Sequence, residues 1–246
     1  PPAALYLGRR ETGPVFAQVE ALEPHEAPAA AAGDQSDGEH LNWQHPFEFI
    51  AQLDRIQREI VTAALALGNW HLSHTHSPRD GQPTAPARGG WERRDPHGGE
   101  HFPRTDPAVI VLIEHEDRLL LGSNVLWESG RFSLLAGFVE AGESAEQAVV
   151  REVAEEAGIL VDQVQYVASQ PWPFPRSLML GFRARLADGV LPADAVPDPE
   201  EISELRWFTR AELRDPAPDL ILPGALSIAR WLIDLWVNEG DDGGAS

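Results

Sequence analysis

The chain has 246 residues, of which 43% are hydrophobic and 24% charged, values within the ordinary range of globular proteins. Its 19 basic groups, all arginine, are outnumbered by 39 acidic groups, which gives a net charge of −20. This charge opposes non-specific binding to phosphate backbones, although a composition bias that improves solubility produces the same balance. The chain has no cysteine, which excludes disulfides, thiol catalysis and cysteine-bound zinc.

The sequence shows no sign of a membrane or secretory segment. No stretch approaches the roughly 18 uncharged apolar residues that a membrane-spanning helix needs. The first residues, Pro1-Pro2-Ala3-Ala4-Leu5, lack the basic start and apolar core of a signal peptide. Together with the lack of cysteine, these features lead us to expect a cytoplasmic protein.

The first hundred residues predict a small α+β domain followed by an irregular module. The segment 15–19 is strand-like, and the Ala-, Pro-, Gly- and Asp-rich stretch 23–39 indicates a loop. Apolar residues then recur at three- and four-residue steps, which predicts an amphipathic helix over 47–67. The Gly-, Pro-, Arg- and His-rich segment that follows is typical of a compact irregular module. We therefore place an N-terminal domain at 1–68 and the module at 69–104.

Strand and helix patterns alternate over the rest of the chain. Strands are predicted at 108–113, 119–121, 132–139, 178–186 and 205–209, the first two as a hairpin. Helices are predicted at 145–157 and 226–237. Ser144 and Gln147 fit a capping box at the start of the first helix, and Gly158 fits its stop. This alternation predicts a mixed α/β domain over 105–246.

Three carboxylates stand on one face of the predicted helix 145–157. Glu152, Glu155 and Glu156 are spaced i, i+3 and i+4, so they repel one another unless cations lie between them. Magnesium prefers such oxygen ligands together with substrate phosphates. Arg151, four residues before Glu155, can brace that carboxylate. An acidic, solvated helix face would contain the same glutamates, so these residues alone leave both interpretations open.

The pattern around these carboxylates is more specific. It resembles the Nudix box: Gly, five residues, Glu, seven residues, then Arg-Glu-apolar-any-Glu-Glu-any-Gly-apolar. All positions match, namely Gly137, Glu143, Arg151, Glu152, Val153, Glu155, Glu156, Gly158 and Ile159. Gly137 and Gly142 permit tight loop geometry before the helix.

The resemblance implies the Nudix fold, an α/β/α sandwich in which the box forms a loop, a helix and a second loop. It also implies attack of water on phosphorus, assisted by Mg²⁺ or Mn²⁺. By this resemblance Glu152, Glu155 and Glu156 are metal ligands, and Arg151 belongs to the catalytic set. Glu156, or else Glu155, also helps to deprotonate the water.

A second motif, Ser169-Gln170-Pro171-Trp172-Pro173-Phe174-Pro175-Arg176-Ser177, follows the box. Three prolines alternating with aromatic residues predict a rigid extended segment that can hold a flat ring, although a plain proline-stiffened loop has the same composition. The string is similar to the SQPWPFPxS array of the NADH pyrophosphatases, a Nudix subfamily. That resemblance implies cleavage of NAD(H) to nicotinamide mononucleotide and AMP, and bacterial relatives also remove NAD caps from RNA.

The resemblance covers about residues 45–240 and implies further site residues. The segment 198–202 is similar to the family segment that supplies another metal ligand, and that role falls on Glu201. The substrate-binding residues that the resemblance implies are Phe102, Phe138, Gln170, Trp172, Phe174, Ser177, Glu201 and Ala229. The family usually forms homodimers, so we expect a homodimer.

The chain departs from this subfamily at its zinc ribbon, which uses four cysteines in two CxxC pairs. The corresponding positions are Ser77, Asp80, Arg94 and His97, and neither serine nor arginine is a credible zinc ligand. Nearby histidines are His71, His74, His76, His97 and His101. Three of them (His71, His74 and His101) match flanking family positions rather than ligand positions. We therefore expect a zinc-ribbon-like module without structural zinc, which folds through packing and hydrogen bonds.

The leading hypothesis is therefore metal-dependent hydrolysis of NAD(H). One alternative is removal of NAD caps from RNA, with a groove that uses Arg93, Arg94 or Arg104. Another is hydrolysis of a different nucleoside diphosphate derivative such as ADP-ribose. A non-catalytic nucleotide sensor belongs to a different class, and the complete set of box carboxylates argues against it.

Overall fold

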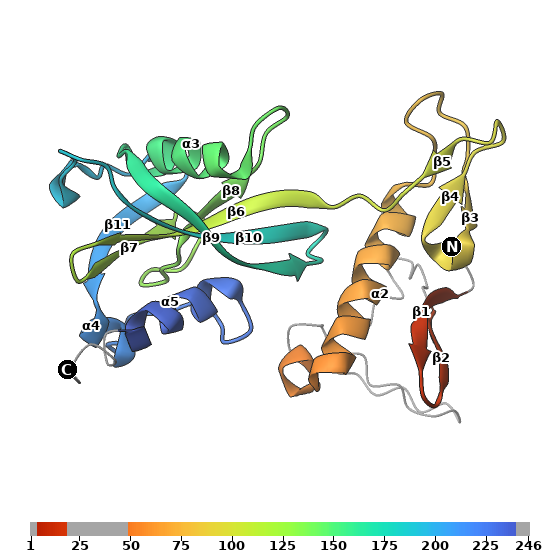
Figure 1. Cartoon of the computed structure of the whole chain (residues 1–246), viewed down its shortest axis with the longest axis horizontal. Coiled ribbons are helices and arrows are strands. Elements are labelled where there is room, and N and C mark those ends of the chain that lie inside the picture. The colour runs from red at the N-terminus through yellow and green to blue at the C-terminus, as the bar shows by residue number, and fades with distance from the viewer. Residues whose placement is uncertain (1–3, 19–48, 240–246) are drawn as a thin grey trace. The chain divides into compact units, whose positions relative to one another are not determined.

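The computed structural model describes residues 4–18 and 49–239, which form two compact units (Figure 1). Unit 1 contains the described residues up to 105 together with 173–176, and unit 2 contains 106–172 and the residues from 177 onward. The loop expected at 23–39 and the end of the strand-like segment 15–19 lie outside the described residues. None of the described helices is long and apolar enough to cross a membrane.

Unit 2 is built on a six-stranded mixed sheet with the order β11-β7-β6-β10-β9, in which β8 also pairs with β6. Its strands are β6 (Asp106–His115), β7 (Arg118–Asn124), β8 (Leu135–Phe138), β9 (Val161–Trp172), β10 (Ser177–Leu186) and β11 (Ile202–Thr209). Its helices are α3 (Ala145–Ala157), α4 (Arg210–Arg214) and α5 (Ile228–Glu239), with a short 3-10 turn η3 (Pro192–Asp194). Strands β6 and β10 run parallel, and the other pairs are antiparallel.

The alternation of side chains along β6 gives the sheet two apolar faces. Val109, Val111 and Ile113 pack in the core that contains α3, whereas Ile110 and Leu112 pack in the core that contains α5. Figure 1 shows α3 and α5 on opposite sides of the sheet. The expected α/β/α sandwich is therefore confirmed.

Most elements predicted for unit 2 are present. The β6–β7 hairpin forms, and α3 has the expected bounds, with Ser144 and Gln147 in a reciprocal capping box and Gly158 left-handed at φ 66°. The strand predicted at 132–139 is shorter, because Phe132 donates instead to the carbonyl of Ile221 and Ser133 pairs with Gly122. Strand β9 was not predicted, since polar residues interrupt its apolar alternation.

The proline–aromatic array (residues 169–177) is not extended throughout, which corrects the sequence-based expectation. Its first four residues end β9, residues 173–176 form a turn, and Ser177 begins β10 opposite Trp172. Proline has no N–H to donate to a ladder, so pairing stops where Pro173 and Pro175 alternate with Phe174. The turn belongs to unit 1, although both flanking strands belong to unit 2.

Unit 1 combines a hairpin, a long helix and a small sheet. Its elements are β1 (Leu5–Arg10), β2 (Gly13–Ala17), η1 (Ile50–Gln52), α2 (Arg55–Ser73), β3 (Ala85–Ala87), η2 (Arg88–Gly90), β4 (Glu92–Arg94) and β5 (Glu100–His101). The helix predicted at 47–67 begins and ends later than expected. It begins after Asp54, whose carboxylate accepts from the Gln57 amide at 2.8 Å in a capping box, and its apolar face continues to Trp70.

His71 fixes the end of α2 against the small sheet. Its ring is buried, with Nε2 at 2.8 Å from the carbonyl oxygen of Gly90 and Nδ1 at 2.9 Å from Nη1 of Arg93. A carbonyl only accepts and a guanidinium only donates, so this geometry selects the neutral Nε2–H tautomer. Burial lowers the pKa of His71, and the neighbouring Arg93 lowers it further. Arg93 also donates to the hydroxyl and carbonyl oxygens of Thr84, both at 2.7 Å.

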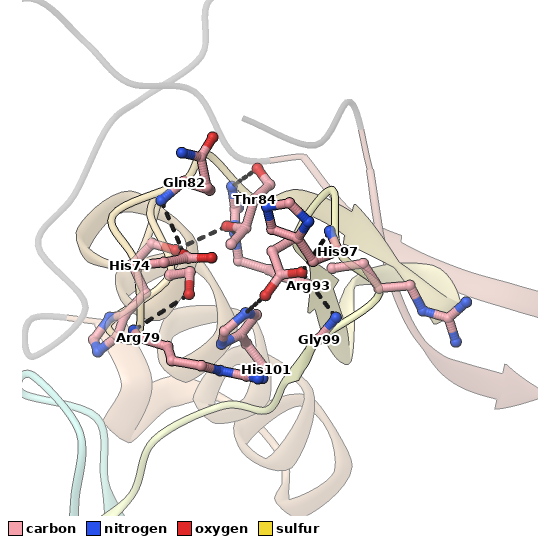
Figure 2. A network of polar contacts seen from close by, with 12 residues as sticks. His74, Arg79, Gln82, Thr84, Arg93, His97, Gly99 and His101 are labelled. Carbon is pink, nitrogen blue, oxygen red and sulfur yellow. Dashed lines mark hydrogen bonds and ion pairs between the residues drawn. The ribbon is translucent and has the colours of Figure 1, made fainter.

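Hydrogen bonds close the two tight turns that correspond to the CxxC pairs of a zinc ribbon (Figure 2). In the first turn, Ser77 accepts from the Arg79 amide at 3.3 Å through its hydroxyl. In the second, the Asp95 carboxylate accepts from the amides of His97 at 2.9 Å and Gly99 at 2.8 Å. The same carboxylate lies 3.1 Å from Nε2 of His101.

The inward-facing group of the second turn is Asp95 rather than Arg94. The Asp95 side chain is 2% exposed, and its hydrogen bonds, first that from Gly99, lower its pKa. Arg94 is half exposed and pairs with Glu92 and Glu100. Within residues 4–18 and 49–239, no three histidine, aspartate or glutamate side chains are grouped to hold a metal ion.

Replacing Asp95 with alanine should loosen this turn. We expect hydrogen exchange of residues 92–101 to accelerate about tenfold or more in Asp95→Ala, because the amides that the carboxylate binds lose a buried acceptor. Asp80→Ala is the control, since Asp80 is exposed and its hydrogen bonds, from the Gln82 amide at 3.2 Å and with the Ser77 side chain, lie in the first turn. Exchange rates that stay equal in both variants, measured by mass spectrometry, would contradict a role for Asp95 in closing the turn.

Candidate active site

A cavity of about 640 Å³ in unit 2 brings together the predicted metal-binding carboxylates. Its lining consists of Ala108, Ala136, Gly137, Phe138, Glu140, Arg151, Glu152, Glu155, Glu156, Ser177, Met179, Asp198 and Glu201. These residues come from α3, from β6, β8 and β10, and from the two loops that precede α3 and β11. The four carboxylates expected as metal ligands therefore share one cavity, although Glu201 lies far from the others in sequence.

Gly137 allows α3 to approach β8 closely. A Cβ atom at this position would collide with the carboxylate of Glu152. The backbone of Gly137 is not left-handed, so the glycine is needed for space rather than for an unusual φ. Gly142 does have a positive φ of 90°, as a tight loop before the helix requires.

Arg151 is the centre of the hydrogen-bond network at the helix. It donates to both oxygens of Glu143 at 2.9 Å, and its Nη1 lies 2.9 Å from Glu152 and from Glu155. It also donates to the carbonyl of Phe138 at 2.8 Å. The expected brace on Glu155 is present, and the bidentate pair with Glu143 ties the preceding loop to α3. These bonds raise the pKa of Arg151 and lower that of Glu143.

Glu156 is the most deeply buried carboxylate of the cavity. The residue is 7% exposed, and its Oε2 has no hydrogen-bond partner among the described residues. Burial, followed by the charges of Glu152 and Glu201, raises its pKa to about 8. Burial also raises the pKa of Glu152. Carboxylates in this situation are stabilised by a cation, so the residues present fit a divalent metal ion.

The cavity fits a metal ion by the type of its donor atoms. Among the described residues, the side chains that carry these atoms do not yet surround one point. Arg151 holds Glu152 and Glu155. The donors are all carboxylate oxygens, the type that Mg²⁺ and Mn²⁺ prefer.

The last turn of α3 also positions Glu201. The final carbonyls of a helix have no partners inside it, and here loop residues supply them. The amide of Val196 donates to Ala157 at 2.9 Å, and that of Asp198 donates to Glu156 at 3.1 Å. The carbonyl of Asp198 then accepts from Glu201 at 3.2 Å. These bonds fix the loop that carries Glu201 to the residue that carries the buried carboxylate.

The cavity contains residues that sequence reasoning did not assign a role. They include Glu140, Met179 and Asp198. In the sequence, the Asp-Pro pair at 198–199 favours a turn, and this turn is the feature by which Asp198 could have been noticed. The carboxylate of Asp198 accepts from the Glu200 amide at 3.0 Å, as expected for such a turn.

Three of the predicted substrate-binding residues, Phe138, Ser177 and Glu201, line the cavity. Gln170 does not, because its side chain donates to the carbonyl of Leu226 and accepts from the amide of Ile228, both at 2.7 Å. Gln170 therefore anchors the start of α5.

The other predicted substrate-binding residues are also absent from the cavity lining. Ala229 lies in the first turn of α5 and is buried in the core, which is a packing position. Trp172 ends β9, whereas Phe102 and Phe174 belong to unit 1.

The raised pKa of Glu156 predicts a pH-dependent stability of the metal-free protein. The folded state keeps this proton up to about pH 8, whereas an unfolded glutamate releases it near 4.5, so stability falls as pH rises through this range. Glutamine stays neutral. In EDTA, Glu156→Gln should therefore melt at an increasingly higher temperature than the wild type from about pH 5 to pH 8.

Glu146→Gln is the control for this measurement, because Glu146 is exposed on the same helix. It should shift the melting temperature little, and equally at all pH values. A gain for Glu156→Gln that does not change with pH would show that its carboxylate titrates normally.

The chain is similar to known proteins of one family. The NUDIX domain model matches residues 104–232. The chain is 45% identical over 258 residues to the NAD-capped RNA hydrolase NudC of Mycobacterium bovis (BCG Pasteur), which covers 96% of this chain and 76% of the relative. It is 40% identical over 232 residues to the protein of the same name from Stutzerimonas stutzeri, covering 94% and 76%.

The crystal structure of a NUDIX hydrolase from Nitrosomonas europaea matches with a TM-score of 0.55 and 23% identity, covering 69% of this chain and 93% of the other. At that identity the structural match supports the fold alone. The family model and the NudC relatives carry the assignment further: this chain belongs to the Nudix hydrolase family.

Proposed function

We propose that this protein hydrolyses the pyrophosphate bond of NAD(H), giving nicotinamide mononucleotide and AMP, with the help of a divalent metal ion. The observation that carries the proposal is the single cavity that Glu152, Glu155, Glu156 and Glu201 line, with one oxygen of Glu156 buried and unpartnered among the described residues. The proline–aromatic array and the names of the NudC relatives support NAD as the substrate class.

The four glutamates would hold the metal, and a bound Mg²⁺ or Mn²⁺ would neutralise phosphate charge and make water a better nucleophile. Arg151 keeps Glu152 and Glu155 in place through its two 2.9 Å bonds. Glu156 is the better proton acceptor, because its Oε2 has no described partner while Glu155 is engaged by Arg151. Ser177 and Phe138 line the same cavity and would contact the substrate.

The proposal extends to assembly, location and zinc content. We propose a homodimer, and the exposed apolar loop of Val125, Leu126 and Trp127 is consistent with association between copies. We also propose that the protein is cytoplasmic and holds no structural zinc, in line with the absence of cysteine and with the hydrogen bonds at Asp95.

Removing the proposed base should abolish turnover. With NADH and Mg²⁺ or Mn²⁺, we expect the wild type to release nicotinamide mononucleotide and AMP, detected by chromatography, and EDTA to stop the reaction. Glu156→Gln should lower kcat by about a hundredfold or more, since it removes both a metal ligand and the proton acceptor. Glu146→Gln should keep full activity.

Two outcomes would contradict this proposal. Unchanged turnover in Glu156→Gln would remove the mechanism. Tight binding of NADH to the wild type without any product would instead support a non-catalytic sensor.

Removal of NAD caps from RNA is the second candidate function, favoured by the names of the relatives. Two of the arginines considered for an RNA groove have partners within unit 1. Arg93 is 5% exposed and bonded to His71 and Thr84, and Arg94 is paired with Glu92 and Glu100. Recognition of a capped RNA would therefore rest mainly on its NAD end.

A competition experiment tests this expectation. NADH should inhibit cap removal with an inhibition constant close to its own KM, because both substrates use one cavity. The KM for capped RNA should change less than about threefold between about 50 and 200 mM salt, since few phosphates are contacted. A steep salt dependence, or cap removal that NADH does not inhibit, would indicate a separate RNA-binding surface.

A further inference from the structure

Asn69 on α2 holds the turn of the proline–aromatic array through two hydrogen bonds. Its Nδ2 donates to the carbonyl oxygen of Pro173 at 2.9 Å and to that of Pro175 at 3.1 Å. These partners lie more than a hundred residues further along the chain, yet all three residues belong to unit 1. One carboxamide group therefore spans both proline carbonyls of the turn.

The turn needs an external donor of this kind. Pro173 and Pro175 have no N–H, so the segment between β9 and β10 cannot pair with itself as a strand ladder would. Backbone carbonyls that lose their ladder partners must find another donor or remain with water. A side-chain amide has two N–H groups on one nitrogen and can serve two carbonyls at once.

The helix gives Asn69 a fixed position. Its neighbours Gly68 and Trp70 are buried, and so is His71, whose ring bonds to Gly90 and Arg93. Asn69 thus stands on the turn of α2 that packs most closely against the rest of unit 1. The small sheet that replaces a zinc ribbon is linked to the array through this helix.

The array is also held at its other end. Gln170 is bonded through both ends of its amide to Leu226 and Ile228, and Ser177, the last residue of the array, lines the catalytic cavity. The turn at 173–176 lies between these fixed points in the chain. The two bonds from Asn69 therefore fix the carbonyls of Pro173 and Pro175 within this turn.

We infer that Asn69 is a positioning residue for the dinucleotide, which acts by setting the backbone of residues 173–175 and hence the aromatic side chains that bind a flat ring. This inference rests on the proposed function. Asn69 lies outside the cavity lining and provides no group to the reaction, so its contribution falls on binding rather than on the chemical step.

Two variants of Asn69 test this inference. Asn69→Leu keeps the approximate size but removes both donors, and Asn69→Asp places carboxylate oxygens against the two carbonyl oxygens. With NADH as substrate, KM should rise about fivefold or more in Asn69→Leu and further in Asn69→Asp, while kcat stays within about twofold, because the lost bonds order the binding segment only. Arg58→Ala, an exposed change on the same helix, should leave both constants unchanged.

Hydrogen exchange separates this inference from the proposed function. The amides of Phe174, Arg176 and Ser177 should exchange several-fold faster in Asn69→Leu than in the wild type or in Arg58→Ala, whichever substrate the enzyme cleaves. If the wild type does not cleave NADH, the proposed function fails, and exchange together with the NADH dissociation constant still decides the role of Asn69. Unchanged exchange, or an unchanged KM in an NADH-cleaving enzyme, would overturn the inference.

Discussion

The burial of the Glu156 carboxylate beside Glu152 and Glu201 is the interaction on which the site depends. A rise in pKa from 4.5 to about 8 corresponds to on the order of 5 kcal/mol of unfavourable free energy for the charged form. A fold does not retain such a cost at random, because one neutral residue would remove it. A divalent cation would offset this cost, because it favours the charged form of the carboxylates and also attracts an anionic substrate.

The rest of unit 2 keeps these groups together against their repulsion. The apolar side of α3, with Val149 and Val153 fully buried, holds the helix on the sheet regardless of charge. Gly137 lets Glu152 approach β8, and Arg151 neutralises part of the charge while tying Glu143 to the helix. The carbonyls at the end of α3 hold the loop of Glu201. Apolar packing and backbone hydrogen bonds thus offset the electrostatic repulsion among the carboxylates.

Local patterns in the sequence predicted most of unit 2 and the core of its site. The spacing of Glu152, Glu155 and Glu156 defines a helix face, and the capping box at Ser144 with the stop at Gly158 defines the bounds of α3. These are short-range signals, and the structure contains them as predicted. The bonds of Gln170 could not be predicted in this way, because its partners lie more than fifty residues away, in the segment that starts α5. Asn69 has a longer-range partner still, and nothing around it in sequence distinguishes it from any other polar residue on an amphipathic helix.

The small sheet of unit 1 also depends on contacts that its sequence does not reveal. A zinc ion closes two turns by binding four side chains, whereas here each turn is closed separately, by Ser77 in one and by Asp95 in the other. Asp95 does this as a buried carboxylate that accepts backbone amides and faces His101, so its hydrogen bonds replace metal coordination within a single turn. The small sheet supports the end of α2. The bonds of His71 to Gly90 and Arg93 make this contact without a metal ion. The same helix carries Asn69, so this contact also supports the array that Asn69 holds.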